Sequence, residues 1–177
     1  LPETSLVTEK FFNSPSDLAL FVNKLYLSES PQYWDIGTDN VVASEKDEML
    51  DLIRGNITPA TVGGWNWGQV RELNYFLDNA GRAEGDQALI DHYIGIVRML
   101  RGKEYYELVK RYSDVPWYDH VLSDTDIDEL YKPQDSRSFV MEKIMEDLRF
   151  GCKHILPDLK GRVTYTQWYA YGLLART

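Results

Sequence analysis

Apolar residues recur at helical spacing in five stretches of the chain, and this pattern predicts an all-α fold. The first stretch starts with Ser14 as N-cap and Pro15 at the first helical position, residue types that favour a helix start. Its apolar positions then follow at i, i+3, i+4 and i+7, as Leu18, Phe21, Val22 and Leu25. A helix with this spacing buries one face. No stretch of the sequence shows the strong apolar–polar alternation of a half-buried strand.

Four further helices are predicted downstream, and they fall into two pairs. Residues 67–79 and 86–111 form the first pair, and residues 136–155 begin the second. Thr164 and Gln167 have the spacing of a capping box, which predicts where the last helix starts. The inward faces are expected to hold Val70, Leu73 and Leu77, then Leu89, Tyr93, Ile96 and Leu100, then Val140, Ile144, Leu148 and Cys152. Helix–turn–helix pairs in this order predict a tetratricopeptide-like α–α superhelix.

Two glycines inside the third predicted helix indicate how closely it packs. Gly95 and Gly102 lie at interior positions, where glycine costs about 1 kcal/mol relative to alanine. We therefore expect close contact with another helix at these positions, where a side chain would not fit.

Residues 33–64 break the helical pattern. Gly37, Gly55, Pro59 and the pair Gly63-Gly64 interrupt them, and only residues 45–53 are amphipathic. We predict a long, loop-rich excursion. Loops of this length are uncommon in compact domains and are usually functional or disordered.

The amino-acid composition disfavours some classes of function and favours others. The net charge of −9 disfavours a nucleic-acid partner, because a phosphate backbone would be repelled on average. Aromatic residues make up 13% of the chain, with 12 Tyr and 5 Trp, and such residues are common at binding surfaces. Cys152 is the single cysteine, and its apolar surroundings predict a small buried residue. The sequence contains no apolar run of about 18 residues, so it predicts no membrane-spanning helix.

Three stretches carry a family resemblance through their order and spacing. The first is Trp67-Gly68-Gln69-Val70-Arg71, continuing to Asn74-Tyr75-Phe76-Leu77. The second extends from Gly95 through Leu100-Arg101-Gly102 and Tyr105-Tyr106-Glu107 to Tyr112-Ser113-Asp114-Val115-Pro116. The third extends from Ile144 through Asp147-Leu148 to Leu156-Pro157, then Gly161-Arg162-Val163-Thr164 and Leu173-Leu174-Ala175-Arg176.

Together these stretches resemble the SusD/RagB family of Bacteroidetes outer-membrane lipoproteins, from Phe11 to the end of the chain. Ser113 stands where the family's turn usually has glycine, and Gly102 stands where alanine usually follows Leu100-Arg101. Ile96-Val97 replace a common Glu-Ala. These departures concern helix packing and turn geometry.

The resemblance implies a helical scaffold that carries an irregular glycan-binding surface. It implies a surface lipoprotein of the outer membrane, attached through a lipidated cysteine upstream of Leu1, which is not Cys152. It also implies a SusC-like TonB-dependent transporter as partner, to which oligosaccharides or peptides are delivered. On this basis we expect residues 1–177 to be the N-terminal part of a single SusD-like domain, with the helix pair at 136–177 incomplete.

Sugar binding without catalysis needs aromatic faces for the C–H surface of a pyranose and polar groups for its hydroxyls. Trp65 and Asn66 stand at the end of the loop-rich excursion, after two glycines that would allow the ring to face solvent. Tyr33 and Trp34 form a second aromatic group, and Arg54 adds a bidentate donor. The alternative for each is packing. Trp67 is expected to face inward and anchor its helix.

Catalytic and metal sites have weaker support in the sequence. Asp124, Asp126 and Asp128 alternate as in a calcium loop, but Glu129 and Asp135 occupy the positions where an EF-hand needs glycine and glutamate. A solvated acidic loop is the favoured interpretation. The three histidines, at positions 92, 120 and 154, lack ligand spacing. We predict no catalytic residue, metal or cofactor.

Three functions are therefore weighed. The first is capture of oligosaccharides or polysaccharides at the cell surface. The second is a helical-repeat scaffold that binds a protein or peptide. The third is a glycoside hydrolase, which needs a pair of carboxylates. Because the chain has 28 acidic residues, such pairs arise easily by chance and give this function little support. The family resemblance favours the first.

Overall fold

The computed structural model describes residues 11–27, 54–56, 66–157 and 165–177. Within these ranges every element of regular secondary structure is an α-helix, and the only strand-like pairing is an isolated bridge between Val115 and Asp135. The helices are α1 (Pro15–Leu27), α3 (Gly68–Ala80), α4 (Gln87–Tyr112), α5 (Ile127–Leu130), α6 (Arg137–His154) and α7 (Gln167–Arg176). None of these helices is long and apolar enough to cross a lipid bilayer.

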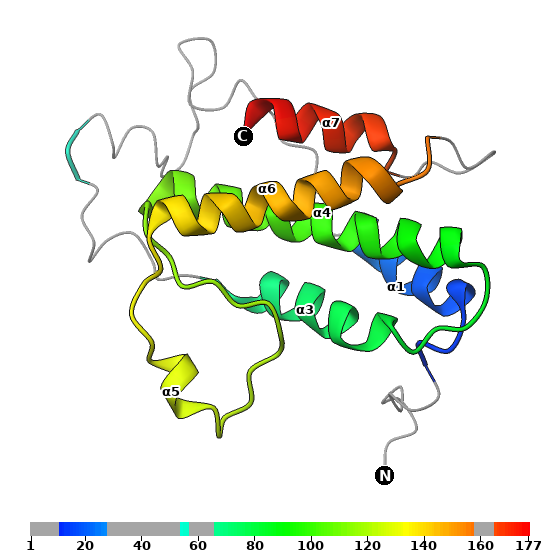
Figure 1. The fold of residues 1–177 in the computed structure, drawn as a ribbon. Helices are drawn as coiled ribbons and strands as arrows, with labels where there is room; N and C mark the ends of the chain where they lie inside the picture. The colour runs from blue at the N-terminus through cyan, green and yellow to red at the C-terminus, as the bar shows by residue number, and fades with distance from the viewer. Residues whose placement is uncertain (1–10, 28–53, 57–65, 158–164) are drawn as a thin grey trace. The chain divides into compact units, whose positions relative to one another are not determined.

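The chain divides into two compact units, residues 1–26 with 67–177 and residues 27–66. In the first unit α3 packs against α4, α4 against α6, and α6 against α7, so that these helices follow one another as successive layers (Figure 1). The predicted helix pairs are confirmed, with bounds that differ from the prediction by one residue at most ends. The predicted amphipathic piece at 45–53 lies outside the described residues.

A capping box starts α1. Ser14 Oγ accepts the Asp17 N–H at 3.3 Å, and Asp17 Oδ2 accepts the Ser14 N–H at 3.0 Å. The N-cap predicted from the sequence is therefore confirmed. The buried face of α1 meets α3 through an aromatic cluster in which the ring centroids of Phe21 and Phe76 lie 5.2 Å apart.

The inward faces differ from the prediction at two positions. Leu77 and Leu89 are only partly buried, whereas Phe76 and Ile90 belong to the fully buried core. The buried stripe is displaced by one residue at each place, because neighbouring helices approach α3 and α4 from directions that sequence spacing does not specify.

The last helix starts later than its capping-box motif predicts. Thr166 is the N-cap of α7, and it makes no side-chain capping bond. Gln167 is consequently the first helical residue and not the third, so the predicted box with Thr164 is wrong. Thr164 itself lies outside the described residues.

The glycines of α4 confirm the predicted close contact. A Cβ on Gly95 would lie 3.1 Å from Ile155 Cγ1, and one on Gly102 would lie 3.3 Å from Leu148 Cγ. Gly151 of α6 faces back toward α4, where its Cβ would meet the Gly95 carbonyl oxygen at 3.3 Å. Side chains are thus excluded from both sides of the α4–α6 contact.

Candidate functional site

The predicted sugar-contact residues lie mostly outside the part of the chain that the structure describes. Tyr33, Trp34 and Trp65 are in this group. Arg54 and Asn66 are described, and both are exposed. Arg54 precedes Gly55, which has a φ of +70°, so it stands at a tight turn. The grouping of these five residues into one site therefore stays a prediction.

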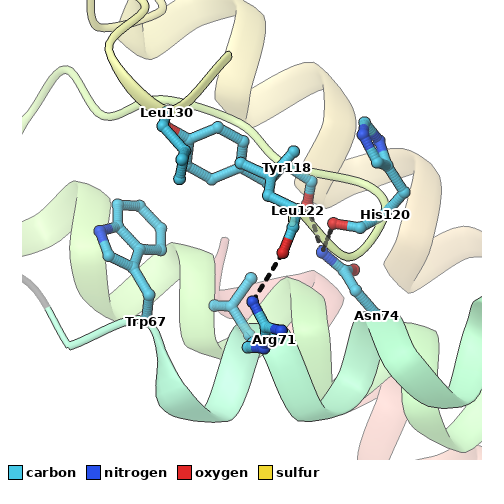
Figure 2. A pocket seen from close by; sticks show the side chains of 8 residues that line it. Trp67, Arg71, Asn74, Tyr118, His120, Leu122 and Leu130 are labelled. Atoms are coloured by element: carbon cyan, nitrogen blue, oxygen red, sulfur yellow. Dashed lines mark hydrogen bonds between the residues drawn. The ribbon is translucent and has the colours of Figure 1, made fainter. Parts of the chain in front are cut away.

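A cleft is present between the start of α3 and the connector, the name used here for residues 113–136 between α4 and α6. Its volume is about 160 Å³. The lining residues are Trp67, Val70, Arg71, Asn74, Tyr118, His120, Leu122 and Leu130. In Figure 2 the side chains from α3 form the floor and those from the connector stand opposite them.

Helical periodicity places the α3 residues on one face. Trp67 precedes the helix as its N-cap, and Val70, Arg71 and Asn74 follow at spacings of three and four. Trp67 is half-buried, and its ring contacts Tyr105 and Tyr118 at centroid distances of 6.1 and 5.3 Å. Its predicted anchoring role is confirmed, and the same side chain also lines the cleft.

Side chains of α3 hold the connector through its backbone carbonyls. Asn74 Nδ2 donates to the carbonyls of Tyr118 and His120 at 2.9 and 3.1 Å, and Arg71 Nη1 donates to that of Leu122 at 2.7 Å (Figure 2). These bonds satisfy carbonyls that have no strand or helix partner. The second wall of the cleft is therefore fixed by specific hydrogen bonds.

A buried ion network lies behind Asn74. Asp147 is 2% exposed, and its carboxylate accepts from Arg98 Nε and Arg101 Nε, each at 2.7 Å. Arg101 also donates from Nη1 to Asn74 Oδ1 at 3.0 Å and to the Asp119 carbonyl at 3.2 Å. Its guanidinium carbon lies 5.1 Å from the centre of the Trp117 ring. One arginine thus links α4, α6, α3 and the connector.

Tyr105 provides the remaining support for the connector. Its hydroxyl accepts the Tyr118 N–H at 2.7 Å and donates to the Tyr118 carbonyl at 3.2 Å. Burial raises the pKa of Tyr105 well above its ordinary value, so the hydroxyl keeps its proton. Tyr118 is consequently held at both its N–H and its carbonyl, and its ring stands at 80° to that of Trp67.

His120 stands at the rim of the cleft among carboxylates. Its Nδ1 lies 2.9 Å from Asp119 Oδ1, and its Nε2 lies 3.5 Å from Glu129 Oε2. The hydrogen bond with Asp119 raises the pKa of His120, with smaller contributions from the charges of Glu129, Asp119 and Asp78. The same hydrogen bond holds the pKa of Asp119 below its ordinary range. The rim therefore balances positive and negative groups.

The arrangement is suited to non-covalent binding. Two aromatic faces and aliphatic side chains line most of the cleft, and Arg71 and His120 supply polar groups at its edge.

Across the described ranges, no cluster of three or more His, Cys, Asp or Glu side chains is placed to hold a metal ion. In the acidic loop, Asp126 Oδ2 accepts the Ser123 N–H and hydroxyl, each at 2.8 Å.

Comparison with known proteins connects this fold to one family. No family model matches the chain. A relative named SusD-like protein P2, from Formosa agariphila, is 26% identical, and the match covers 89% of this chain and 34% of that protein. A solved SusD-like protein from Bacteroides fragilis has a TM-score of 0.69 at 23% identity, covering 95% of this chain and 35% of its own.

A solved SusD-like carbohydrate binding protein from Bacteroides vulgatus has a TM-score of 0.65 at 22% identity, covering 93% of this chain and 41% of its own. The all-α fold is therefore SusD-like. The resemblance to the SusD/RagB family that the sequence predicts is confirmed by these matches in sequence and in structure. The chain spans 34%, about a third, of the length of SusD-like protein P2.

The sequence interpretation missed the connector side of the cleft. The acidic run at Asp124, Asp126 and Asp128 draws attention to charge, whereas the cleft uses Tyr118, Leu122 and Leu130 on either side of it. One usable signal exists, the aromatic pair Trp117-Tyr118 directly after the Val115-Pro116 turn. Aromatic residues in a connector between helix pairs indicate that the connector packs on the helices.

Proposed function

We propose that this chain is part of a cell-surface glycan-binding protein that captures oligosaccharides and delivers them to a SusC-like TonB-dependent transporter. The observation that carries the proposal is the shared fold with a SusD-like carbohydrate binding protein. An N-terminal lipid upstream of Leu1 would hold the protein on the outer membrane. The protein acts by binding and release, and it is not an enzyme.

The proposed capture uses the loop-rich excursion. Trp34 and Trp65 would offer ring faces to the C–H surface of a pyranose, with Tyr33 beside them. Asn66 and Arg54 would exchange hydrogen bonds with hydroxyls, and both are exposed and thus accessible to a ligand. Stacking and hydrogen bonds of this kind are individually weak. Capture is therefore reversible, as delivery to a transporter requires.

Substitution of the two tryptophans tests the proposal. Trp65→Ala and Trp34→Ala are each expected to weaken retention in a native gel that contains a polysaccharide retarding the wild type, while the melting temperature stays nearly constant. Trp168→Ala is the matched control, because Trp168 is 66% exposed on α7 and is not among the proposed contacts. Unchanged retention in both loop variants would remove the site assignment.

The alternative function is a helical-repeat scaffold for a protein or peptide. The exposed aromatic face of α7 favours it, since Trp168 and Tyr171 are 66% and 48% exposed with ring centroids 6.1 Å apart. Binding of a peptide library that Trp168→Ala abolishes, without retention on any polysaccharide, would support the scaffold over glycan capture.

A further inference from the structure

We infer that the cleft between α3 and the connector is a second carbohydrate subsite, which accepts a single neutral pyranose ring. This inference rests on the proposed glycan-binding function, but it uses a different set of residues from the loop-rich excursion. All of its lining residues are described and belong to one compact unit.

The size of the cleft limits its occupant. Ligand pockets for drug-sized molecules have roughly 300–1,000 Å³, whereas this cleft has about 160 Å³. An oligosaccharide would not fit inside it. One sugar ring, either free or at the end or branch of a longer chain, is the size of occupant that the cleft favours.

The walls fit the shape of a pyranose. The rings of Trp67 and Tyr118 meet at 80° with centroids 5.3 Å apart, and so form an apolar corner. Val70, Leu122 and Leu130 extend this surface. A pyranose has apolar C–H faces and a rim of hydroxyls, so one face can pack in the corner while hydroxyls point to the cleft mouth.

The polar edge supplies donors for those hydroxyls. Arg71 is exposed and uses Nη1 to hold the Leu122 carbonyl, and a guanidinium has several further N–H donors. His120 lines the same edge, but its Nδ1 is hydrogen-bonded to Asp119 and its Nε2 lies 3.5 Å from Glu129, so Arg71 is the main donor for a ligand. Asn74, in contrast, is engaged at both its oxygen and its nitrogen, so it positions the connector and does not serve the ligand.

The charges around the edge favour a neutral sugar over an acidic one. Arg71 is the permanently charged cation of the lining, and His120 is a second basic group, which is cationic when protonated. Asp119 and Glu129 flank His120, and Asp78 of α3 accepts the Val121 N–H at 2.9 Å nearby. These three carboxylates offset the charge of Arg71, and that of His120 when it is protonated. A uronic acid would therefore gain little from the cationic groups and would be repelled by the carboxylates.

The cleft is formed before a ligand arrives. Asn74, Arg71 and Tyr105 hold the connector backbone by five hydrogen bonds from side chains. Binding then has little ordering cost to overcome, which matters for a ligand that makes few contacts. Leu130, at the mouth, is 43% exposed, so it can be changed without disturbing the core.

Filling the cleft is the sharpest test, and α5 offers a matched pair of positions. Leu130→Trp would place a large ring into the cleft mouth. Ile127→Trp places the same ring on the same short helix, at a residue that is 54% exposed and does not line the cleft. The readout is the indole ¹H–¹⁵N signal of Trp67, assigned by its loss in Trp67→Phe.

The 177-residue chain is titrated with the methyl glycosides of glucose, galactose and mannose, and with glucuronate. We expect at least one neutral glycoside to shift the Trp67 signal with a Kd in the millimolar range. Leu130→Trp should weaken that binding at least fivefold, Ile127→Trp should leave it unchanged, and glucuronate should bind more weakly than the neutral glycoside.

If no neutral glycoside shifts the Trp67 signal, the subsite is overturned, and equal weakening of glycoside binding by both tryptophan variants would overturn it too. Retention on a polysaccharide without any shift of the Trp67 signal would leave the proposed function intact. A Trp67 shift without retention on any polysaccharide would support the subsite and count against the proposed function. The two failures are therefore separable.

Discussion

The α4–α6 interface and the α3–connector cleft belong to the same compact unit, yet they are built differently. At the α4–α6 interface, Gly95 and Gly151 remove side chains so that the backbones approach closely. At the cleft, Asn74 and Arg71 reach from α3 to carbonyls of the connector and leave space between them. Close packing produces a rigid wall, whereas side-chain hydrogen bonds to a loop produce a cavity with a defined shape.

Arg101 connects the two regions. Through Asp147 it belongs to the α4–α6 interface, and through Asn74 and the Asp119 carbonyl it supports the connector. The cleft therefore depends on a buried network that is remote from solvent.

The largest effect is expected from Asp147→Ala. This substitution leaves Arg101, whose side chain is 8% exposed, without its carboxylate partner. Loss of one member of a buried ion pair typically costs about 3–5 kcal/mol, so we expect the free energy of unfolding in urea to fall by that amount. Glu146→Ala, at a 60% exposed neighbour, is the control and should change stability by less than about 0.5 kcal/mol. Equal effects of the two variants would contradict the role of the network.

Acidification should destabilise the α4–α6 side through His92. This residue is fully buried, its Nδ1 accepts the Leu156 N–H at 3.0 Å, and burial lowers its pKa from 6.5 to about 4. The unfolded chain therefore binds the proton first, so stability is lost as pH falls from about 6.5 to 4. The shift corresponds to roughly 3 kcal/mol. Urea unfolding at pH 7 and pH 4.5 should show a smaller loss in His92→Gln than in the wild type.

The cleft side should respond to pH in the opposite direction. The pKa of His120 is raised, chiefly by Asp119, so its contribution is present at low pH and is lost as pH rises through its folded pKa. His120→Gln should therefore make the loss of stability on acidification larger. A smaller loss would show that the carboxylates at the rim do not stabilise the imidazolium.

Gly151→Ala tests the close contact between α4 and α6. The new Cβ would lie 3.2 Å from Met99 Cβ and 3.3 Å from the Gly95 carbonyl oxygen. Overpacking costs typically 1–3 kcal/mol and the gain in helix propensity is about 1 kcal/mol, so we expect a net loss of up to about 2 kcal/mol by thermal or urea unfolding. Gly172→Ala on α7, where a Cβ meets no atom within 4 Å, should instead stabilise by up to about 1 kcal/mol.

The smallest effect is expected where the connector begins. Ser113 ends α4 with φ of +67° and ψ of −81°, a conformation that favours glycine. Ser113→Gly should therefore raise stability by about 1 kcal/mol, as measured by urea unfolding. Ser136→Gly is a suitable contrast, because Ser136 has extended backbone and its hydroxyl caps α6, so its loss should not stabilise.

Sequence periodicity predicted the helices because each buries a stripe of apolar residues whose spacing depends on local geometry alone. It also predicted the contact at Gly95, because an unfavourable residue inside a helix needs a tertiary reason. The cleft could not be predicted in the same way. It depends on Asn74 meeting carbonyls 44 and 46 residues further along the chain, and sequence spacing carries no information about that distance.

The site prediction shows the same limit. Residue type and loop position predict Trp65 and Trp34 as sugar contacts, and with Tyr33 these residues lie outside the described residues. The serine at position 113, where the family's turn usually has glycine, is visible in the sequence, but the positive φ that makes serine unfavourable there needed the structure.

The most direct test of glycan capture is native-gel electrophoresis of the protein in gels that contain plant, host or microbial polysaccharides, with reducing ends assayed in parallel. Retardation on one polysaccharide without release of reducing sugar is the predicted result. Release of reducing sugar would identify an enzyme, and normal migration on every polysaccharide would contradict glycan capture and favour the scaffold.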